Sequence, residues 1–247
     1  MVSVKKIAIF VEGHTELAFV EKFLLEIGNS NQLSVRKEEL QGGGKSPLII
    51  RFVGEKPITG ETKYQILLRS SCNDEKVLAD IKEHYAELMQ NGFEKIIGIR
   101  DLYRKDKDNY PRQNNVKSAM KQFIEQNHLQ NAHMVLAVME IETWFIAETT
   151  HFSKIHSDLT AQTILPIIDL AKINDFEGEI QHPADTLNQI YHLVGFAYQK
   201  KGKQVQRTIN ALDYAEMYLK LRKKLPNLDD LVSHLDNLFD IHENIEE

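Results

Sequence analysis

The chain has 247 residues, enough for one large domain or two small ones, and its 42% hydrophobic and 27% charged residues are typical of a soluble globular protein. Its formal net charge of −6 argues against a protein that binds nucleic acid through positive charge along its whole length. The single cysteine excludes an internal disulfide framework and a cysteine-rich zinc module. Because no window approaches the roughly 20 apolar residues that cross a bilayer, and no signal-peptide core is present, we expect a cytoplasmic protein without a membrane segment.

Apolar runs alternate with amphipathic patterns in the first two thirds of the chain. The pattern predicts strands at residues 6–11, 32–40, 64–68, 95–100 and 134–139, and helices at 15–27, 74–89 and 114–126, with another helix from Trp144. Strands that alternate with helices favour a mostly parallel sheet with right-handed crossovers. After residue 158 only helical patterns remain, at 159–172, 184–194, 204–224 and 228–239. We therefore predict an α/β core over residues 1–150 and a helical region over residues 151–247, packed on the core as one domain.

Acidic residues follow three of the predicted strands. Glu12 follows the first strand, Asp101 follows the strand at 95–100, and Glu140, with Glu142 two residues on, follows the strand at 134–139. If these strands are parallel neighbours, the acids meet beyond their carboxyl ends, where ligands bind in open α/β sheets. Clustered carboxylates repel one another and recruit a hard cation, and oxygen-only ligation suits Mg²⁺ or Mn²⁺. Each acid alone is equally explained as a helix cap or a loop side chain, so the coincidence of three indicates the metal site.

A glycine-rich segment, GGGKS at residues 42–46, is similar to the end of a phosphate-binding loop. The full pattern requires a glycine at the position of Glu39, and no strand–loop–helix unit surrounds the segment. We therefore expect a flexible surface loop there. Trp144, just after Glu142, is better explained as a core side chain than as a platform for a nucleic-acid base.

The acidic positions lie in segments that resemble a known family. VEGHTELAFVEKFL resembles the first motif of Toprim-type domains, in which a strand delivers a glutamate followed by glycine, and IIGIRDLYRKDKDNYP resembles the second, a strand that ends in an aspartate. More narrowly, three segments are similar to a bacterial family of unknown function, domain-of-unknown-function family 4276: Asp101-Leu102-Tyr103, Glu140-x-Glu142-x-Trp144 and YQKKGKQVQRTI. That family is similar to the nuclease domains of the overcoming-lysogenization-defect family, many of them associated with phage defence. The resemblance runs from Lys6 to about Leu235.

The resemblance implies a Toprim-like, Rossmann-like sheet flanked by helices, and hydrolysis of DNA or RNA with Mg²⁺ or Mn²⁺. It also implies a protein partner in a defence system. In this interpretation four residues are both catalytic and metal-binding: Glu12, Asp101, Glu140 and Glu142. Residues 195–225 hold eight basic and two acidic side chains, and from this stretch the resemblance selects Lys200, Lys201 and Lys203 as contacts to the substrate phosphate. A solvated basic face beside an acidic tail is the simpler interpretation of the same charges.

The second Toprim motif departs from its usual form. Toprim sites carry Asp-x-Asp there, whereas this chain has Asp101 and Tyr103, which puts two-metal chemistry in doubt unless Asp106 or Asp108 reaches in from the loop. The missing aspartate and the acidic net charge favour the alternative, a non-catalytic module that binds a nucleotide or a partner protein. A small-molecule phosphoesterase would use the same metal chemistry, and the sequence does not separate it from a nuclease.

Overall fold

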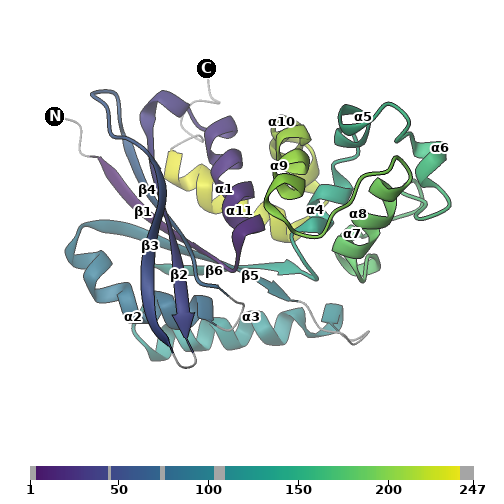
Figure 1. Cartoon of the computed structure of the whole chain (residues 1–247). Coiled ribbons are helices and arrows are strands. Elements are labelled where there is room, and N and C mark those ends of the chain that lie inside the picture. Colours follow the sequence, from purple (N-terminus) through teal and green to yellow (C-terminus); the bar gives the residue numbers. More distant parts are fainter. Residues whose placement is uncertain (1–3, 44–45, 73–75, 103–108, 240–247) are drawn as a thin grey trace, which may run out of the picture. The chain divides into compact units, whose positions relative to one another are not determined.

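The computed structural model describes residues 4–43, 46–72, 76–102 and 109–239. In these residues six strands form one sheet in the order β3-β2-β4-β1-β5-β6 (Figure 1). β1 pairs in parallel with β4 and β5, β2 pairs in parallel with β4, and β3 is antiparallel to β2. The predicted α/β class with a mostly parallel sheet is therefore confirmed. The strands are β1 (Lys5–Val11), β2 (Leu33–Gly43), β3 (Ser46–Lys56), β4 (Tyr64–Ser70), β5 (Phe93–Leu102) and β6 (Ala132–Val138).

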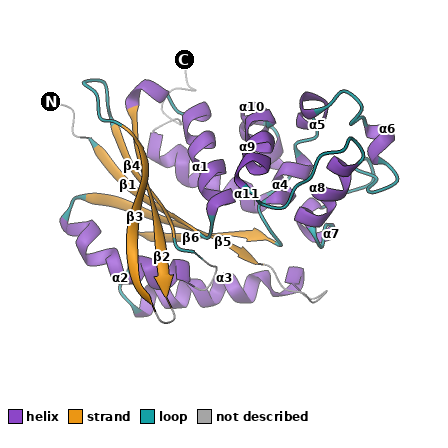
Figure 2. Cartoon of the chain, in the orientation of Figure 1, coloured by secondary structure: helices purple, strands orange, loops and turns teal. Residues whose placement is uncertain are grey.

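By compactness the chain separates into two units, residues 1–100 with 114–136 and residues 101–113 with 137–247. This division does not coincide with the predicted boundary at residue 150, because the last residues of β5 and β6 group with the helical region. The expectation that this region packs on the core as one domain stays a prediction. Beyond Val138 the described chain contains helices and loops without strands (Figure 2).

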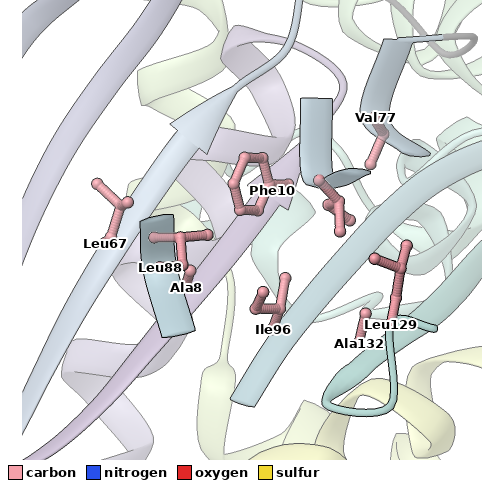
Figure 3. Packing of buried hydrophobic residues seen from close by; sticks show 9 residues of the cluster. Ala8, Phe10, Leu67, Val77, Leu88, Ile96, Leu129 and Ala132 are labelled. Carbon is pink, nitrogen blue, oxygen red and sulfur yellow. The ribbon is translucent and has the colours of Figure 1, made fainter. Parts of the chain in front are cut away.

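The first unit has helices on both faces of its strands, α1 (His14–Ile27) on one face and α2 (Lys76–Gln90) with α3 (Asn109–Gln126) on the other (Figure 1). Side chains alternate across a strand, so Ala8 and Phe10 of β1 share one face of the sheet. Both are fully buried in a cluster with Val77 and Ile81 of α2 (Figure 3). Burial of each such large side chain stabilises the fold by about 1.5–3 kcal/mol. This packing explains why β1 reads as an almost continuous apolar run.

The edge strand β3 is missing from the sequence prediction. Gly43 of β2 pairs with Ser46 of β3, so the expected flexible loop is wrong for Gly42, Gly43 and Ser46, which lie in strands. Residues 44 and 45 lie outside the described residues. The apolar side chains of β3 are largely exposed, because the strand lies at the edge of the sheet; they are Ile49, Ile50, Phe52 and Val53. A bulge opposite Lys37 and Glu38, where the pairing shifts register, interrupts the ladder and protects this edge from further pairing.

The second unit is built from short helices. The predicted helix at 159–172 is reduced to α6, which ends before Pro166, since proline has no backbone N–H to continue the helical hydrogen bonds. The predicted helix at 204–224 is divided by Asp213, whose side chain accepts a hydrogen bond from the backbone N–H of Glu216 and so begins a new helix. The helices are α4 (Glu142–Ala147), α5 (His151–Ile155), α6 (Ala161–Ile164), α7 (Phe176–Glu179), α8 (Pro183–His192), α9 (Gly202–Ala211), α10 (Tyr214–Leu219) and α11 (Pro226–Phe239), with 3₁₀ turns at Ser30–Gln32 and Leu221–Lys223.

The length and hydropathy of the helices bear on membrane insertion. Within the described part of the chain, none of them combines the length and the apolar character that crossing a bilayer requires.

Candidate functional site

Three of the predicted acidic residues lie in the second unit, at the carboxyl ends of β5 and β6. Asp101 is the penultimate residue of β5 and is 5% exposed. Glu140 comes two residues after the end of β6, and Glu142 is the first residue of α4 and is fully buried. The backbone N–H of Met139 donates to the carbonyl oxygen of Leu102 at 3.1 Å, which holds the two strand ends together. These two strand ends therefore carry the three acids; that the acids form one functional centre stays a prediction.

Lys200 joins the two glutamates. Its Nζ lies 2.7 Å from Oε1 of Glu140 and 3.2 Å from Oε2 of Glu142. The Lys200 side chain is 36% exposed, that of Glu140 14%, and that of Glu142 not at all. The lysine therefore enters from the solvent side, and the glutamates lie deeper. This residue was predicted to contact substrate phosphate, and in the structure its charge is already engaged by the predicted metal ligands.

The protonation of Lys200 follows from these neighbours. Partial burial lowers the pKa of the ammonium, but attraction to Glu142 and Glu140, the hydrogen bond to Glu140 and attraction to Asp101 outweigh it, so the pKa is raised. Lys200 therefore remains a cation at neutral pH. It cannot act as a general base in this arrangement, because a base must first lose its proton.

The second oxygen of each glutamate is held by a neutral donor. The hydroxyl of Tyr198 donates to Oε1 of Glu142 at 2.8 Å, and the backbone N–H of Ala184 donates to Oε2 of Glu140 at 3.2 Å. Ala184 lies in the first turn of α8, where backbone N–H groups lack helical partners and favour negative charge. Among the described residues, a neutral hydrogen bond thus orients each carboxylate, and the ammonium of Lys200 contacts both.

Tyr198 is the residue that the sequence prediction missed. It is 2% exposed, and its backbone N–H donates to Oδ1 of Asn188 at 2.7 Å, which fixes the segment leading to Lys200. A signal was present in the sequence, since Tyr198 opens the YQKKGKQVQRTI segment on which the family resemblance rests. Nothing in that segment indicated that its hydroxyl would reach a glutamate 56 residues earlier in the chain.

Lys201 and Lys203 differ from Lys200. Both are exposed at the start of α9, where Lys201 is the N-terminal cap residue and provides no side-chain cap. Within the described part of the chain, neither makes an ion pair. The first turn of α9 contains no acidic residue. These two lysines and the amino end of the helix therefore present positive charge to solvent, as contact with an anion requires.

Glu12 belongs to the first unit. It follows β1 directly and is half-buried, and its carbonyl oxygen accepts a hydrogen bond from Oγ of Ser70 at 3.4 Å. The parallel register of β1 and β5 pairs Phe10 with Gly98. That Glu12 shares a centre with the acids of the second unit stays a prediction.

The fit of a divalent cation has two parts. The donor chemistry fits, because Asp101, Glu140 and Glu142 offer only carboxylate oxygens. The spacing does not, because the two glutamates are separated to suit an ammonium ion, with N–O distances of 2.7 and 3.2 Å, whereas Mg²⁺ requires about 2.0–2.1 Å. Among the described residues, no group of three or more His, Cys, Asp or Glu side chains is arranged to hold a metal ion. Tyr103, Asp106 and Asp108 lie outside those residues.

Two other features of the second unit are structural. Trp144 is fully buried and its indole N–H donates to Oε1 of Glu177 at 3.1 Å, which confirms its predicted place in the core. An open cavity of about 560 Å³ has Glu148 in its wall, and none of the candidate site residues lines it. Glu148 accepts backbone N–H bonds from Thr150 at 2.9 Å and from Asp213 at 3.2 Å, so its carboxylate joins two loops.

The chain was also compared with known proteins. No family model, no curated protein and no solved structure matches it.

Proposed function

We propose that this protein hydrolyses phosphodiester bonds of nucleic acid, DNA or RNA, with Mg²⁺ or Mn²⁺ as cofactor. The observation that carries the proposal is the convergence of Asp101, Glu140 and Glu142 at two neighbouring strand ends, around one cation supplied by the chain itself. A concentration of carboxylates at this edge of a parallel sheet is costly unless a cation compensates it, and such edges are where ligands bind.

In this proposal different residues of the chain bind the metal, orient its ligands and bind the phosphate. A bound divalent ion would supply Lewis acidity and a water of lowered pKa. Glu140 and Glu142 would hold that ion, and the bonds from Ala184 and Tyr198 would keep the carboxylates oriented. The exposed Lys201 and Lys203, at the amino end of α9, would bind the phosphate backbone.

The family resemblance supports the same proposal from the sequence side. A Toprim-like assignment, Glu12 as a further carboxylate and a role in phage defence with a protein partner all belong to this proposal. The overall charge of −6 does not oppose it, because residues 195–225 carry eight basic side chains against two acidic ones.

The test is cleavage of single- and double-stranded DNA and RNA by the purified protein with Mg²⁺, Mn²⁺ or a chelator. We expect cleavage that depends on the metal, and a loss of about 100-fold or more in rate for Asp101→Asn, Glu140→Gln and Glu142→Gln. Glu125→Gln on α3 is the matched control, because Glu125 is exposed and distant in sequence from every candidate residue. The proposal fails if the parent cleaves no nucleic acid, or if the three variants cleave it as fast as the parent.

Glu12→Gln tests the predicted fourth carboxylate separately. A comparable loss of rate would include Glu12 in the centre. An unchanged rate would exclude Glu12 and leave the proposal for the other three acids intact.

A second candidate, a non-catalytic binding module, is favoured by one observation. Lys200 already neutralises part of the acidic cluster, and the described residues contain no arranged metal site. Calorimetry at millimolar Mg²⁺ or Mn²⁺ separates the two functions. Absence of metal binding together with absence of cleavage, with retained binding of a nucleotide or an oligonucleotide, would establish this candidate.

A further inference from the structure

The contacts of Glu140 and Glu142 divide into permanent and replaceable ones. Each carboxylate has one oxygen on a neutral donor, Ala184 N–H or Tyr198 O–H, and the other oxygen on the ammonium of Lys200. If the ammonium left, the neutral donors would still orient both carboxylates. The position of the ammonium, between Oε1 of Glu140 and Oε2 of Glu142, would then favour another cation.

The side chain of Lys200 can be displaced from the two glutamates more easily than an arginine. Its ammonium is a single point charge on a flexible stem, unlike the guanidinium fork of arginine, and its side chain is 36% exposed. The backbone of Lys200 has φ of 53°, in the left-handed region that residues with a Cβ adopt at a cost.

We propose that Lys200 is the resident counter-ion of this acidic centre, and that its ion pairs with Glu140 and Glu142 exclude a divalent cation from the same carboxylates. The steric reason is direct, because Nζ lies 2.7 and 3.2 Å from the oxygens that would have to approach a metal to within about 2.1 Å. The electrostatic reason is that a divalent ion beside an unmoved ammonium adds repulsion at close range.

The consequence for regulation rests on the proposed function. A divalent cation held by Glu140 and Glu142 would take the place of the Lys200 ammonium, and the freed charge would add to that of Lys201 and Lys203 for a phosphate chain. Conversely, the competing ammonium weakens the apparent affinity for the metal. The centre therefore responds to the concentration of free divalent cation rather than remaining loaded at all concentrations.

The first test measures Mn²⁺ binding by calorimetry, without any activity assay. Lys200→Met removes the ammonium and keeps an unbranched side chain, and we expect its dissociation constant for Mn²⁺ to fall about tenfold or more below that of the parent. Lys201→Met is the matched control, since it removes the same charge one residue away without an ion pair to the glutamates, and we expect a change of less than about threefold. Equal or weaker Mn²⁺ binding by Lys200→Met would overturn the proposal.

The second test uses the unaltered protein, in case Lys200→Met does not fold. Reductive methylation is followed by peptide mass spectrometry with and without Mn²⁺, and Lys201 serves as the internal standard. Displacement by the metal frees the Lys200 amine from its carboxylates, so its labelling relative to Lys201 should rise several-fold. Unchanged or reduced labelling in saturating Mn²⁺, or no Mn²⁺ binding by either protein, would contradict it.

The two proposals fail separately. Tighter Mn²⁺ binding by Lys200→Met in a protein that cleaves no nucleic acid retains the counter-ion role and removes the proposed function. Metal-dependent cleavage with unchanged Mn²⁺ affinity in Lys200→Met retains the function and removes the counter-ion role.

Discussion

Two charge clusters, one in each unit, neutralise carboxylates with different cations. One uses a buried arginine and the other a partly exposed lysine. In the first unit, Nε and Nη2 of Arg69 donate to Oε2 of Glu38 at 3.1 and 2.8 Å, and Nη1 lies 3.6 Å from Oδ1 of Asp80. Arg69, Glu38 and Asp80 are each no more than 6% exposed. In the second unit, a partly exposed lysine makes one contact to each of two glutamates.

Arg69 is a fixed structural cation, whereas Lys200 is a replaceable one. The guanidinium contacts both acids with a rigid fork, and further donors complete the cluster: Arg36 on Glu38 at 2.8 Å and Ser71 on Asp80 at 2.7 Å. Both acids are buried, so a competing ion has little access to them. The lysine of the other cluster is a point charge at the surface of an acidic pair. We therefore expect the first cluster to contribute to stability and the second to ligand response.

The largest expected effect is on the first cluster. Arg69→Met retains an aliphatic contact with Phe10, whose ring lies 5.3 Å from the guanidinium, but removes the buried cation that Glu38 and Asp80 share and leaves them with the more exposed Arg36 and His84. We expect a loss of about 3–5 kcal/mol in the free energy of unfolding in urea. Arg36→Met, at the exposed side of the same acid, should lose less than about 1 kcal/mol. Equal losses in the two variants would show that the buried guanidinium of Arg69 stabilises the fold no more than the exposed one of Arg36.

Removal of Lys200 should cost less. Lys200→Met leaves a buried Glu142 that still accepts from Tyr198, so we expect a loss of about 1–2 kcal/mol, between the limits for exposed and buried pairs. Saturating Mn²⁺ should recover stability in Lys200→Met and not in Arg69→Met. The comparison fails if Lys200→Met is as destabilised as Arg69→Met. It also fails if Mn²⁺ changes the free energy of unfolding in urea equally in the two variants.

A smaller effect concerns pH. A hydrogen bond from His84 to the carboxylate of Asp80 raises the pKa of His84 in the folded protein, while partial burial and Arg69 oppose it, so protonated His84 is favoured by folding. A raised folded-state pKa contributes stability that is complete below the unfolded value, near 6.5, and is lost as pH rises through the folded value. The difference in unfolding free energy between the parent and His84→Gln should therefore shrink from pH 6 to pH 9. A difference that is constant or grows with pH would contradict this.

The smallest effect on stability is expected at the exposed lysines. Lys201→Met with Lys203→Met should change the unfolding free energy by no more than about 0.5 kcal/mol, because neither lysine makes an ion pair in the described part of the chain. If both contact phosphates, the slope of log affinity for an oligonucleotide against log salt should fall by about 1–2. Fluorescence anisotropy across a salt series measures this slope, and an unchanged slope would remove the phosphate contacts.

Local patterns predicted most of the sheet and the short list of acids. Four of the strands, β1, β4, β5 and β6, are visible as apolar runs because strands buried on both faces have no polar alternation, whereas β2 is mostly polar. The strand β3 was not visible, since its apolar residues lie exposed at an edge after a triple glycine. The short helices of the second unit were predicted as longer ones, because an amphipathic pattern continues through Pro166 and Asp213 even where the backbone does not.

The sequence by itself determined that Asp101, Glu140 and Glu142 stand at strand ends, because an apolar run followed by an acid is a local signal. Only the tertiary structure decided what neutralises them. The contact between Lys200 and Glu140 spans 60 residues, and that between Tyr198 and Glu142 spans 56. Such pairs leave no periodic trace in the chain, since they depend on how the loop before α9 returns to the end of β6. Of the three lysines that the sequence assigns to a substrate phosphate, Lys200 thus contacts the protein's own carboxylates.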